Sequence, residues 1–150
     1  MIPDINVIVA ASRSDHVHHT ATTAWLDGVM VARAGNGTIE ILPVVAAGFL
    51  RIVTNARVFV DPTPIDRAVA FIDALLSSQS AEMPDTGREW PALRQLCREQ
   101  GLTGNDIPDA WIAATVKSLR GHLVTFDRGF RRLLGRGELT VLLPGERRLN

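Results

Sequence analysis

Four aspartates are the residues whose types and positions could do chemistry together. Asp4 follows the short apolar start of the chain, Asp127 follows the apolar run 122–126, and Asp109 opens an alanine-rich segment with Asp106 three residues before it. Like charges brought within a few ångströms repel one another unless a cation lies between them or a carboxylate takes up a proton. Carboxylate oxygens are ligands of hard divalent cations such as Mg²⁺ and Mn²⁺. An acidic metal site is therefore the first chemical hypothesis.

These aspartates can meet only if the strands that precede them run side by side. Short apolar runs predict the strands, and amphipathic or alanine-rich stretches predict the helices between them. The predicted strands are the residues up to Asp4, 38–42, 122–126 and 139–143, and the predicted helices are 5–11, 18–33, 44–53, 65–77, 87–100, 109–119 and 128–134. In an open parallel sheet, ligands bind outside the carboxyl ends of the strands. Asp4 and Asp127 both lie at such ends.

The alternation of short strands with helices predicts an α/β fold whose parallel sheet is covered by helices on both faces. A chain of 150 residues fits one such domain, covering residues 1–150. No internal repeat, low-complexity tract or linker divides the sequence.

Each aspartate also has a purely structural explanation. Asp4 precedes the first predicted helix, Asp127 precedes the last, and Asp106 with Asp109 forms a D-x-x-D pair at a helix start. Aspartate is a common N-cap residue, and such a cap contributes about 0.5–2 kcal/mol. Capping explains each aspartate singly, whereas their joint placement favours a site. The two roles do not exclude each other.

Composition excludes several other classes of protein. The single cysteine, Cys97, cannot form an internal disulfide, and with four histidines it cannot build a cysteine-rich zinc site. The chain has no run of about 18 apolar residues, as a membrane helix needs, and Asp4 stands where a signal peptide carries basic residues, so we expect a soluble, cytoplasmic protein with no membrane partner. A formal net charge of zero excludes nucleic-acid binding by bulk charge alone.

Basic residues are nevertheless concentrated near the C-terminus. Seven arginines and three acidic residues lie from residue 120 onward. An arginine fork fits a phosphate group, which suits a nucleic-acid substrate. Genomic base composition explains the abundance of arginine equally well, and both explanations stay open.

The other conspicuous side chains are assigned structural roles. Trp25, Trp90 and Trp111 fall on apolar helical faces and are expected in the core or at an interface, with Trp90 pointing inward. Cys97 is expected as a small core residue. The histidines near residue 18 are expected at a solvated helix start rather than at a transition metal.

Several motifs, in order along the chain, resemble the signature of PIN-domain ribonucleases, and most of all the VapC toxins of bacterial toxin–antitoxin pairs. They are Pro3-Asp4-Ile5-Asn6-Val7, Gly48-Phe49-Leu50-Arg51-Ile52-Val53-Thr54-Asn55, Gly104-Asn105 ahead of Asp109-Ala110-Trp111-Ile112-Ala113-Ala114, and Thr125-Phe126-Asp127-Arg128-Gly129-Phe130. The resemblance runs from about residue 2 to 143. It implies a PIN-like three-layer α/β/α fold with a short central parallel sheet of four to five strands.

The same resemblance assigns site residues. Asp4, Asp109 and Asp127 match the family's metal-binding carboxylates. The family often carries a glutamate on the third helix, but Gly48 occupies the matching position here. Asp106, one turn from Asp109, is the residue we expect to replace that glutamate as a metal ligand.

Four further residues are given supporting or substrate-contacting roles by the resemblance. Asn6 is expected to hold the first loop, and Thr125 to position Asp127 or a water molecule. Arg51 and Thr54 share a helical face and are expected to contact RNA phosphate or support the site. A salt bridge within the fold is an equal alternative for Arg51.

The resemblance implies a Mg²⁺- or Mn²⁺-dependent endoribonuclease that hydrolyses RNA phosphodiesters. It also implies a VapB-like antitoxin as partner and a homodimer, for which the apolar faces of helices 44–53 and 65–77 are candidates. A catalytically degenerate PIN domain that binds RNA or protein is the alternative, because Gly48 replaces an acid. A phosphoacceptor receiver is disfavoured because the only lysine, Lys117, falls inside a helix.

Overall fold

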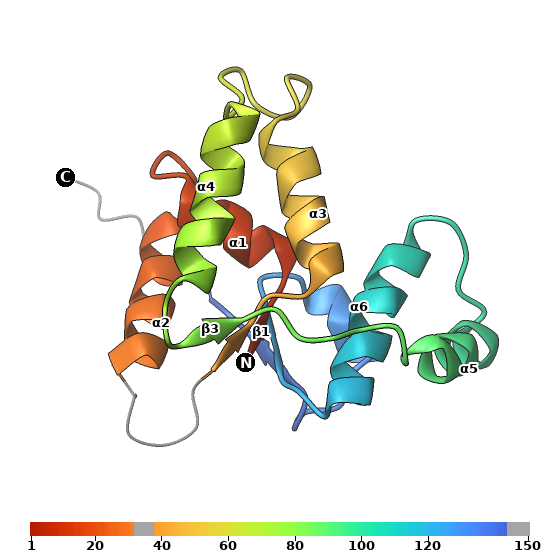
Figure 1. Ribbon diagram of the computed structural model, residues 1–150. Helices are drawn as coiled ribbons and strands as arrows, with labels where there is room; N and C mark the ends of the chain where they lie inside the picture. The colour runs from red at the N-terminus through yellow and green to blue at the C-terminus, as the bar shows by residue number, and fades with distance from the viewer. Residues whose placement is uncertain (32–37, 144–150) are drawn as a thin grey trace.

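The sheet is built from very short parallel strands in a computed structural model that describes residues 1–31 and 38–143 (Figure 1). Three of them, β1 (Ile2–Pro3), β4 (Leu123–Thr125) and β5 (Leu139–Val141), form a sheet in the order β1-β4-β5. All three residues of β4 are buried. A central strand covered on both faces is buried throughout, as the continuous apolar run 122–126 predicts.

The other two strands form a second parallel pair beside the first sheet. They are β2 (Ile39–Glu40) and β3 (Ala81–Glu82). The amide of Glu40 donates to the carbonyl oxygen of Met1 over 2.8 Å, so β2 lies next to the start of β1. The predicted parallel α/β architecture is confirmed, although its strands divide into a three-stranded and a two-stranded sheet. The strand β3 was not predicted, because two residues are too few to set up an alternating pattern.

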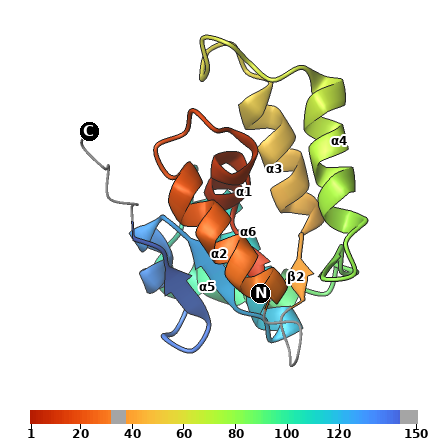
Figure 2. The same cartoon turned by 90° about the vertical axis from the view of Figure 1, so that its left-hand side faces the viewer.

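The helices follow the predicted order. They are α1 (Ile5–Ser12), α2 (His19–Val31), α3 (Pro43–Val53), α4 (Ile65–Leu76), α5 (Trp90–Gln100) and α6 (Asp106–Leu119), with a short 3₁₀ helix, η1 (Arg128–Arg132). Both views show α3 and α4 side by side (Figure 1, Figure 2). The helix α5 packs on α6, away from the α1–α4 group. The end predicted for the second helix, at residue 33, lies outside the described residues.

The core is formed where α1, α3 and α6 meet the strands. Ile8, Phe49, Ile112 and Leu123 have no more than 1% of their surface exposed. The middle of α6 is buried along five consecutive residues, 112–116. This burial anchors both the strand ends and the start of α6, which carry the predicted acidic residues.

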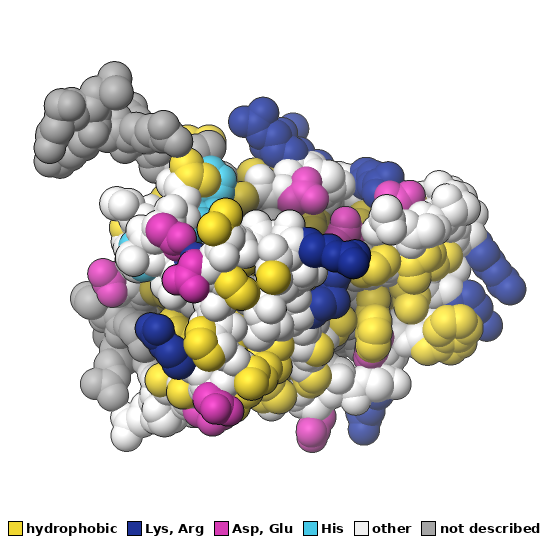
Figure 3. Space-filling model, turned by 90° about the horizontal axis from the view of Figure 1, so that it is seen from above, with side chains coloured by type: hydrophobic (Ala, Val, Ile, Leu, Met, Phe, Trp, Pro, Cys, Tyr) yellow, Lys and Arg dark blue, Asp and Glu magenta, His cyan; other side chains and the backbone are white. Residues whose placement is uncertain are grey.

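Two of the three tryptophans that were expected in the core or at an interface are exposed on the surface of the chain. The helix α5 begins at Trp90, so this residue occupies the exposed first turn, and it is 63% exposed. Trp111 is 44% exposed, although its indole N–H donates to Glu89 over 2.9 Å. The side of the molecule that carries α5 and α6 shows apolar side chains among arginines (Figure 3). The prediction was wrong for Trp90 because helical spacing does not reveal which face meets a neighbour.

None of the helices in the described ranges is long and apolar enough to cross a membrane.

Candidate active site

Asp4 lies at the carboxyl end of β1, beside the end of β4. Pairing of Pro3 with Val124 places Asp4 next to Thr125 across the sheet. The Asp4 carboxylate caps α1 by accepting from the Ile5 amide over 2.7 Å. The side chain is only 5% exposed. The sequence therefore predicted both the strand-end position and the capping role of this aspartate.

Asn6 and Thr125 bind the same carboxylate oxygen of Asp4. The Thr125 hydroxyl donates to Asp4 Oδ2 over 2.6 Å, and Asn6 Nδ2 donates to it over 2.7 Å. Asn6 Oδ1 also accepts from the Phe126 amide over 3.2 Å, which joins the start of α1 to the residue after β4. Asn6 was expected to hold the first loop; it lies in the first turn of α1, where one of these bonds holds Asp4 and the other crosses to the end of β4.

Asp127 is held by the same threonine through its backbone. Its amide donates to Thr125 Oγ1 over 2.9 Å, and its carboxylate accepts from the Gly129 amide over 2.6 Å as the N-cap of η1. The carboxylate is exposed. Thr125 therefore orients two of the three predicted metal ligands at once, because its hydroxyl both donates and accepts.

Asp109 differs from the other two carboxylates because it accepts no hydrogen bond from any described residue. It lies in the first turn of α6 and is half-buried. The N-cap of that helix is Asn105, which makes no side-chain capping bond. Capping therefore does not explain Asp109, and neither does an ion pair. A half-buried carboxylate without a donor from the protein has lost part of its hydration and is free to bind another group.

The three carboxylates interact electrostatically. Burial raises the pKa of Asp4 to about 6, and the charges of Asp109 and Asp127 act in the same direction. Burial raises the pKa of Asp109 as well, followed by the charge of Asp127. Because neighbouring negative charges make ionisation of Asp4 and Asp109 more costly, the cluster favours a bound cation.

Asp106 is placed differently from the other acids. It is the first residue of α6, and its carboxylate forms an ion pair with the guanidinium of Arg132. That hydrogen bond from Arg132 lowers the pKa of Asp106. Two residues 26 positions apart thus meet at the rim of the cluster, and no sequence signal announced the pairing.

Arg51 and Thr54 form no hydrogen bond or ion pair with the three carboxylates in the described parts of the chain. Arg51 is exposed on α3 and forms no ion pair with any described residue. The hydroxyl of Thr54 donates to the carbonyl oxygen of Leu50 over 2.7 Å, so it is used within its own helix. Neither residue is brought to the three carboxylates by a hydrogen bond.

Gly48 lies against α1, where a side chain has little room. A Cβ atom at this position would lie 2.4 Å from Cδ1 of Ile5 and 2.9 Å from its Cγ1. The close approach of α3 to α1 therefore explains the glycine at the position matched to the family's glutamate. The fourth acid expected on this helix has no space there unless Ile5 moves.

The donor set fits a hard divalent cation, because three carboxylates supply only oxygen ligands. No three Asp, Glu, His or Cys side chains in the described parts of the chain lie close enough together to hold an ion directly. Mg²⁺ keeps several of its waters when it binds to proteins, so carboxylates can hold it partly through water. The unpartnered Asp109 is the feature that fits such an ion best.

Comparisons with known proteins agree on one family. A family model for the PIN domain matches residues 1–134. "VapC ribonuclease Mb2897" of Mycobacterium bovis is 40% identical over 131 residues, covering 86% of each chain. "Ribonuclease VapC31" of Mycobacterium tuberculosis is 36% identical over 131 residues, covering 86% of this chain and 89% of the relative.

Solved structures share the fold. The crystal structure of VapBC2 from Rickettsia felis, bound to a DNA fragment from its promoter, aligns over 94% of this chain and 97% of that one with a TM-score of 0.65 at 20% identity. FitAcB from Neisseria gonorrhoeae aligns over 95% and 96% with a TM-score of 0.58 at 17% identity. The chain therefore belongs to the PIN-domain family, and within it to the VapC ribonucleases.

Proposed function

We propose that the protein is a metal-dependent endoribonuclease and the toxin of a toxin–antitoxin pair. The observation that carries this proposal is the half-buried carboxylate of Asp109, which accepts no hydrogen bond from the described residues and has its pKa raised beside Asp127. Names of relatives at 36–40% identity supply the reaction class, hydrolysis of RNA.

Asp4, Asp109 and Asp127 would hold Mg²⁺ or Mn²⁺. When bound, the ion lowers the pKa of a bound water and neutralises charge that develops on the phosphate. The chain's own residues orient the ligands: Thr125 and Asn6 hold Asp4 Oδ2, and Thr125 also holds the backbone of Asp127. Because these bonds are made within the fold, the two carboxylates are ordered before substrate binds.

Single-stranded or looped RNA is the proposed substrate, since its backbone can reach a surface cluster without a duplex being opened. Arg128 and Arg131 are exposed and form no ion pair with the described residues, so they can bind flanking phosphates. Arg51 and Thr54 remain candidates for substrate contact, without a bond to the cluster to support them.

The primary test is cleavage of a mixed structured RNA pool in Mn²⁺ or Mg²⁺, with a chelator control. Asp109→Asn is the sharpest variant, because it removes a charge and no hydrogen bond of the fold. We expect cuts at discrete positions, lost in chelator and slowed at least about 100-fold in the variant, since metal assistance contributes several kcal/mol. Asp73→Asn, on the exposed side of α4, is the matched control and should cut normally.

Cutting by Asp109→Asn at the wild-type rate would refute catalysis at this cluster. The degenerate alternative, a domain that binds RNA or protein without cutting, is favoured by one observation, the closed space at Gly48. It predicts RNA binding with neither cleavage nor Mn²⁺-binding heat. Calorimetric titration with Mn²⁺ separates the two functions.

A VapB-like antitoxin is the proposed protein partner, and the cytoplasm the proposed site of action. The free protein should inhibit growth when expressed, and co-expression with the product of an adjacent small gene should relieve the inhibition. Growth inhibition that persists unchanged in Asp109→Asn would show that RNA cleavage is not its cause.

We also propose a homodimer through α3 and α4. Ile65 and Val69 are exposed on α4 by 53% and 40%, and Val60 in the preceding loop is fully exposed. Ile65 and Val69 are four residues apart and share a helical face, and exposed apolar side chains on one face are typical of interfaces. Sedimentation of Val69→Glu should report a monomer where the wild type sediments as a dimer.

A further inference from the structure

We propose that Arg132 contacts the RNA phosphate at the acidic cluster and that Asp106 positions Arg132 rather than binding a metal ion. The inference rests on the proposed nuclease function and assigns two residues to it. Asp106 was the acid expected to replace the family's glutamate as a metal ligand, and it is given a different role here.

Arg132 is held from two helices. The backbone carbonyl oxygen of Arg132 accepts from Nε2 of Gln100, the last residue of α5, over 2.6 Å. Its guanidinium is bonded to Asp106, the first residue of α6. Because its backbone is held by Gln100 and its guanidinium by Asp106, Arg132 loses less freedom when it binds a ligand and is preorganised.

The 3₁₀ geometry of η1 turns Arg132 toward the cluster. In such a helix, side chains three residues apart lie above one another, so Arg132 shares a face with Gly129. The Gly129 amide donates to Asp127 Oδ1, and a Cβ on this glycine would lie 3.0 Å from that oxygen. The face of η1 that carries Arg132 is therefore the face that the Asp127 carboxylate covers.

The charges agree with this geometry. The hydrogen bond that Arg132 donates to Asp106 raises the pKa of Arg132, and the charges of Asp109 and Asp127 add to that effect. Among the described residues, Asp106 bonds one terminal nitrogen of the guanidinium, and no acceptor is bonded to the other donors. The side chain of Arg132 is 47% exposed. Free N–H donors beside a metal-binding cluster are suited to a phosphate oxygen.

The same ion pair makes Asp106 a poor metal ligand. Its carboxylate already accepts from a cation, and binding an ion would require that bond to be released next to a second positive charge. The unpartnered Asp109, one turn further along α6, has no such competitor. Asp106 is therefore a positioning residue, and Arg132 is the residue that meets substrate.

The test compares Asp106→Asn, Arg132→Ala and the double variant. Arg131→Ala is the matched control, because it also removes one arginine from η1. Mn²⁺ affinity is measured by calorimetry, and kcat and KM are measured on a fluorescein-labelled, mixed-sequence single-stranded RNA. Circular dichroism melting confirms that each variant is folded.

We expect Arg132→Ala to raise KM by about 10- to 100-fold, as for loss of hydrogen bonds to a charged group. Asp106→Asn should raise KM by less, and the double variant should match Arg132→Ala, because Asp106 acts only through Arg132. All three variants should bind Mn²⁺ with a dissociation constant within about twofold of the wild-type value, which is a change of about 0.4 kcal/mol or less in binding free energy. Arg131→Ala should change KM by less than Arg132→Ala.

A tenfold or larger loss of Mn²⁺ affinity in Asp106→Asn overturns the proposal, since it would make Asp106 a ligand. Additive effects of the two substitutions on KM, or equal effects of Arg131→Ala and Arg132→Ala, overturn it as well. If the wild type binds Mn²⁺ but cuts no RNA, the nuclease function fails separately. In that case, the affinity of each protein for the labelled RNA, measured by fluorescence anisotropy, tests whether Arg132 contacts RNA. Equal affinities of wild type and Arg132→Ala would overturn that role.

Discussion

At the scale of single residues, the three carboxylates of the cluster differ in how much of the fold depends on them. Asp4 accepts from three groups, Ile5, Asn6 and Thr125, and is buried. Asp127 caps η1, whereas Asp109 accepts nothing from the described residues. Substitution of Asp4 is therefore expected to disturb both the fold and the proposed metal binding, whereas substitution of Asp109 is expected to disturb the proposed metal binding alone.

The raised pKa of Asp4 predicts a pH-dependent stability for the metal-free protein. Burial raises this pKa from 3.8 to about 6, so the folded state holds a proton that the unfolded state releases. The resulting stabilisation is fully present below pH 3.8 and is lost as the pH rises through about 6. In chelator, the free energy of unfolding should fall by about 1 kcal/mol more in wild type than in Asp4→Asn between pH 5 and pH 7.

Urea unfolding of both proteins at several pH values measures this difference. Parallel pH profiles of wild type and Asp4→Asn would mean that Asp4 stays ionised in the fold. Added Mn²⁺ should flatten the wild-type profile, because a bound cation favours the charged carboxylate.

Gly48 makes a second prediction at this scale. Gly48→Ala gains about 1 kcal/mol in helix propensity but forces Ile5 to move, and overpacking of this kind costs about 1–3 kcal/mol. We expect net destabilisation in the wild-type background and net stabilisation in the Ile5→Ala background, which removes both the Cδ1 and the Cγ1 atoms that the new Cβ meets. Thermal unfolding of the wild type, the two single variants and the double variant gives the coupling free energy between the two positions. Equal effects of Gly48→Ala on stability in both backgrounds would contradict the close approach of Gly48 to Ile5.

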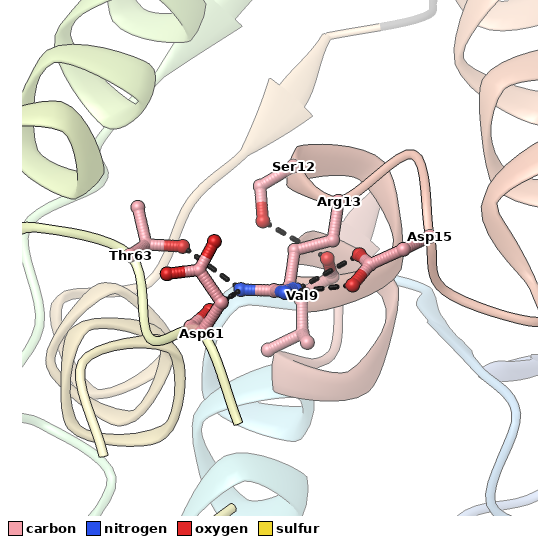
Figure 4. A network of polar contacts seen from close by, with 6 residues as sticks. All are labelled: Val9, Ser12, Arg13, Asp15, Asp61 and Thr63. Carbon is pink, nitrogen blue, oxygen red and sulfur yellow. Dashed lines mark hydrogen bonds and ion pairs between the residues drawn. The ribbon is translucent and has the colours of Figure 1, made fainter. Parts of the chain in front are cut away.

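At the scale of elements, the site depends on a few side chains that tie loops to helices. Arg13, just after α1, forms an ion pair with Asp15 and donates to the Asp61 carbonyl oxygen over 3.0 Å and to Thr63 over 3.2 Å (Figure 4). Its guanidinium also lies 4.0 Å from the ring centre of Phe59. The loop between α3 and α4 is thereby fastened to the end of α1, whose other end carries Asp4.

We therefore predict that Arg13→Lys destabilises the protein by about 1–3 kcal/mol. A lysine keeps the charge but cannot reach these partners at once, because it lacks the planar fork of arginine. The side chain of Arg13 is only 11% exposed, so solvent does not replace the lost bonds. Limited proteolysis should cut within residues 54–64 faster than in wild type. Arg57→Lys, on an exposed residue of the same loop, is the control, and an equal cleavage rate in both variants would refute the role of Arg13.

At the scale of the whole molecule, three segments far apart in sequence share one cluster, so an ion bound there links them. A ligand at about 100 times its dissociation constant stabilises a fold by about 2.7 kcal/mol. For a chain of this length, Mn²⁺ at that ratio should raise Tm by about 5–10 °C. Asp109→Asn should lose this rise and Asp73→Asn should keep it. An undiminished rise in Asp109→Asn would place the ion elsewhere.

The order of strands and helices, the strand-end positions of Asp4 and Asp127, and the start of an alanine-rich helix near Asp109 were all predictable from local sequence. Hydrophobic periodicity, capping residues and proline positions act over a few residues, and each is visible along the chain. The strand β3 and the exposure of Trp90 were not predictable, because one is too short for a pattern and the other depends on which face a neighbour covers.

The sequence by itself determined the α/β class, the elements and the set of acids, since residue type and spacing decide helix, strand and charge. Only the tertiary structure decided which acids interact with one another. It left Asp109 without a hydrogen bond among the described residues, paired Asp106 with Arg132, and closed the space at Gly48 against Ile5. These outcomes depend on contacts between segments distant in the chain, which arise from packing and have no local signature.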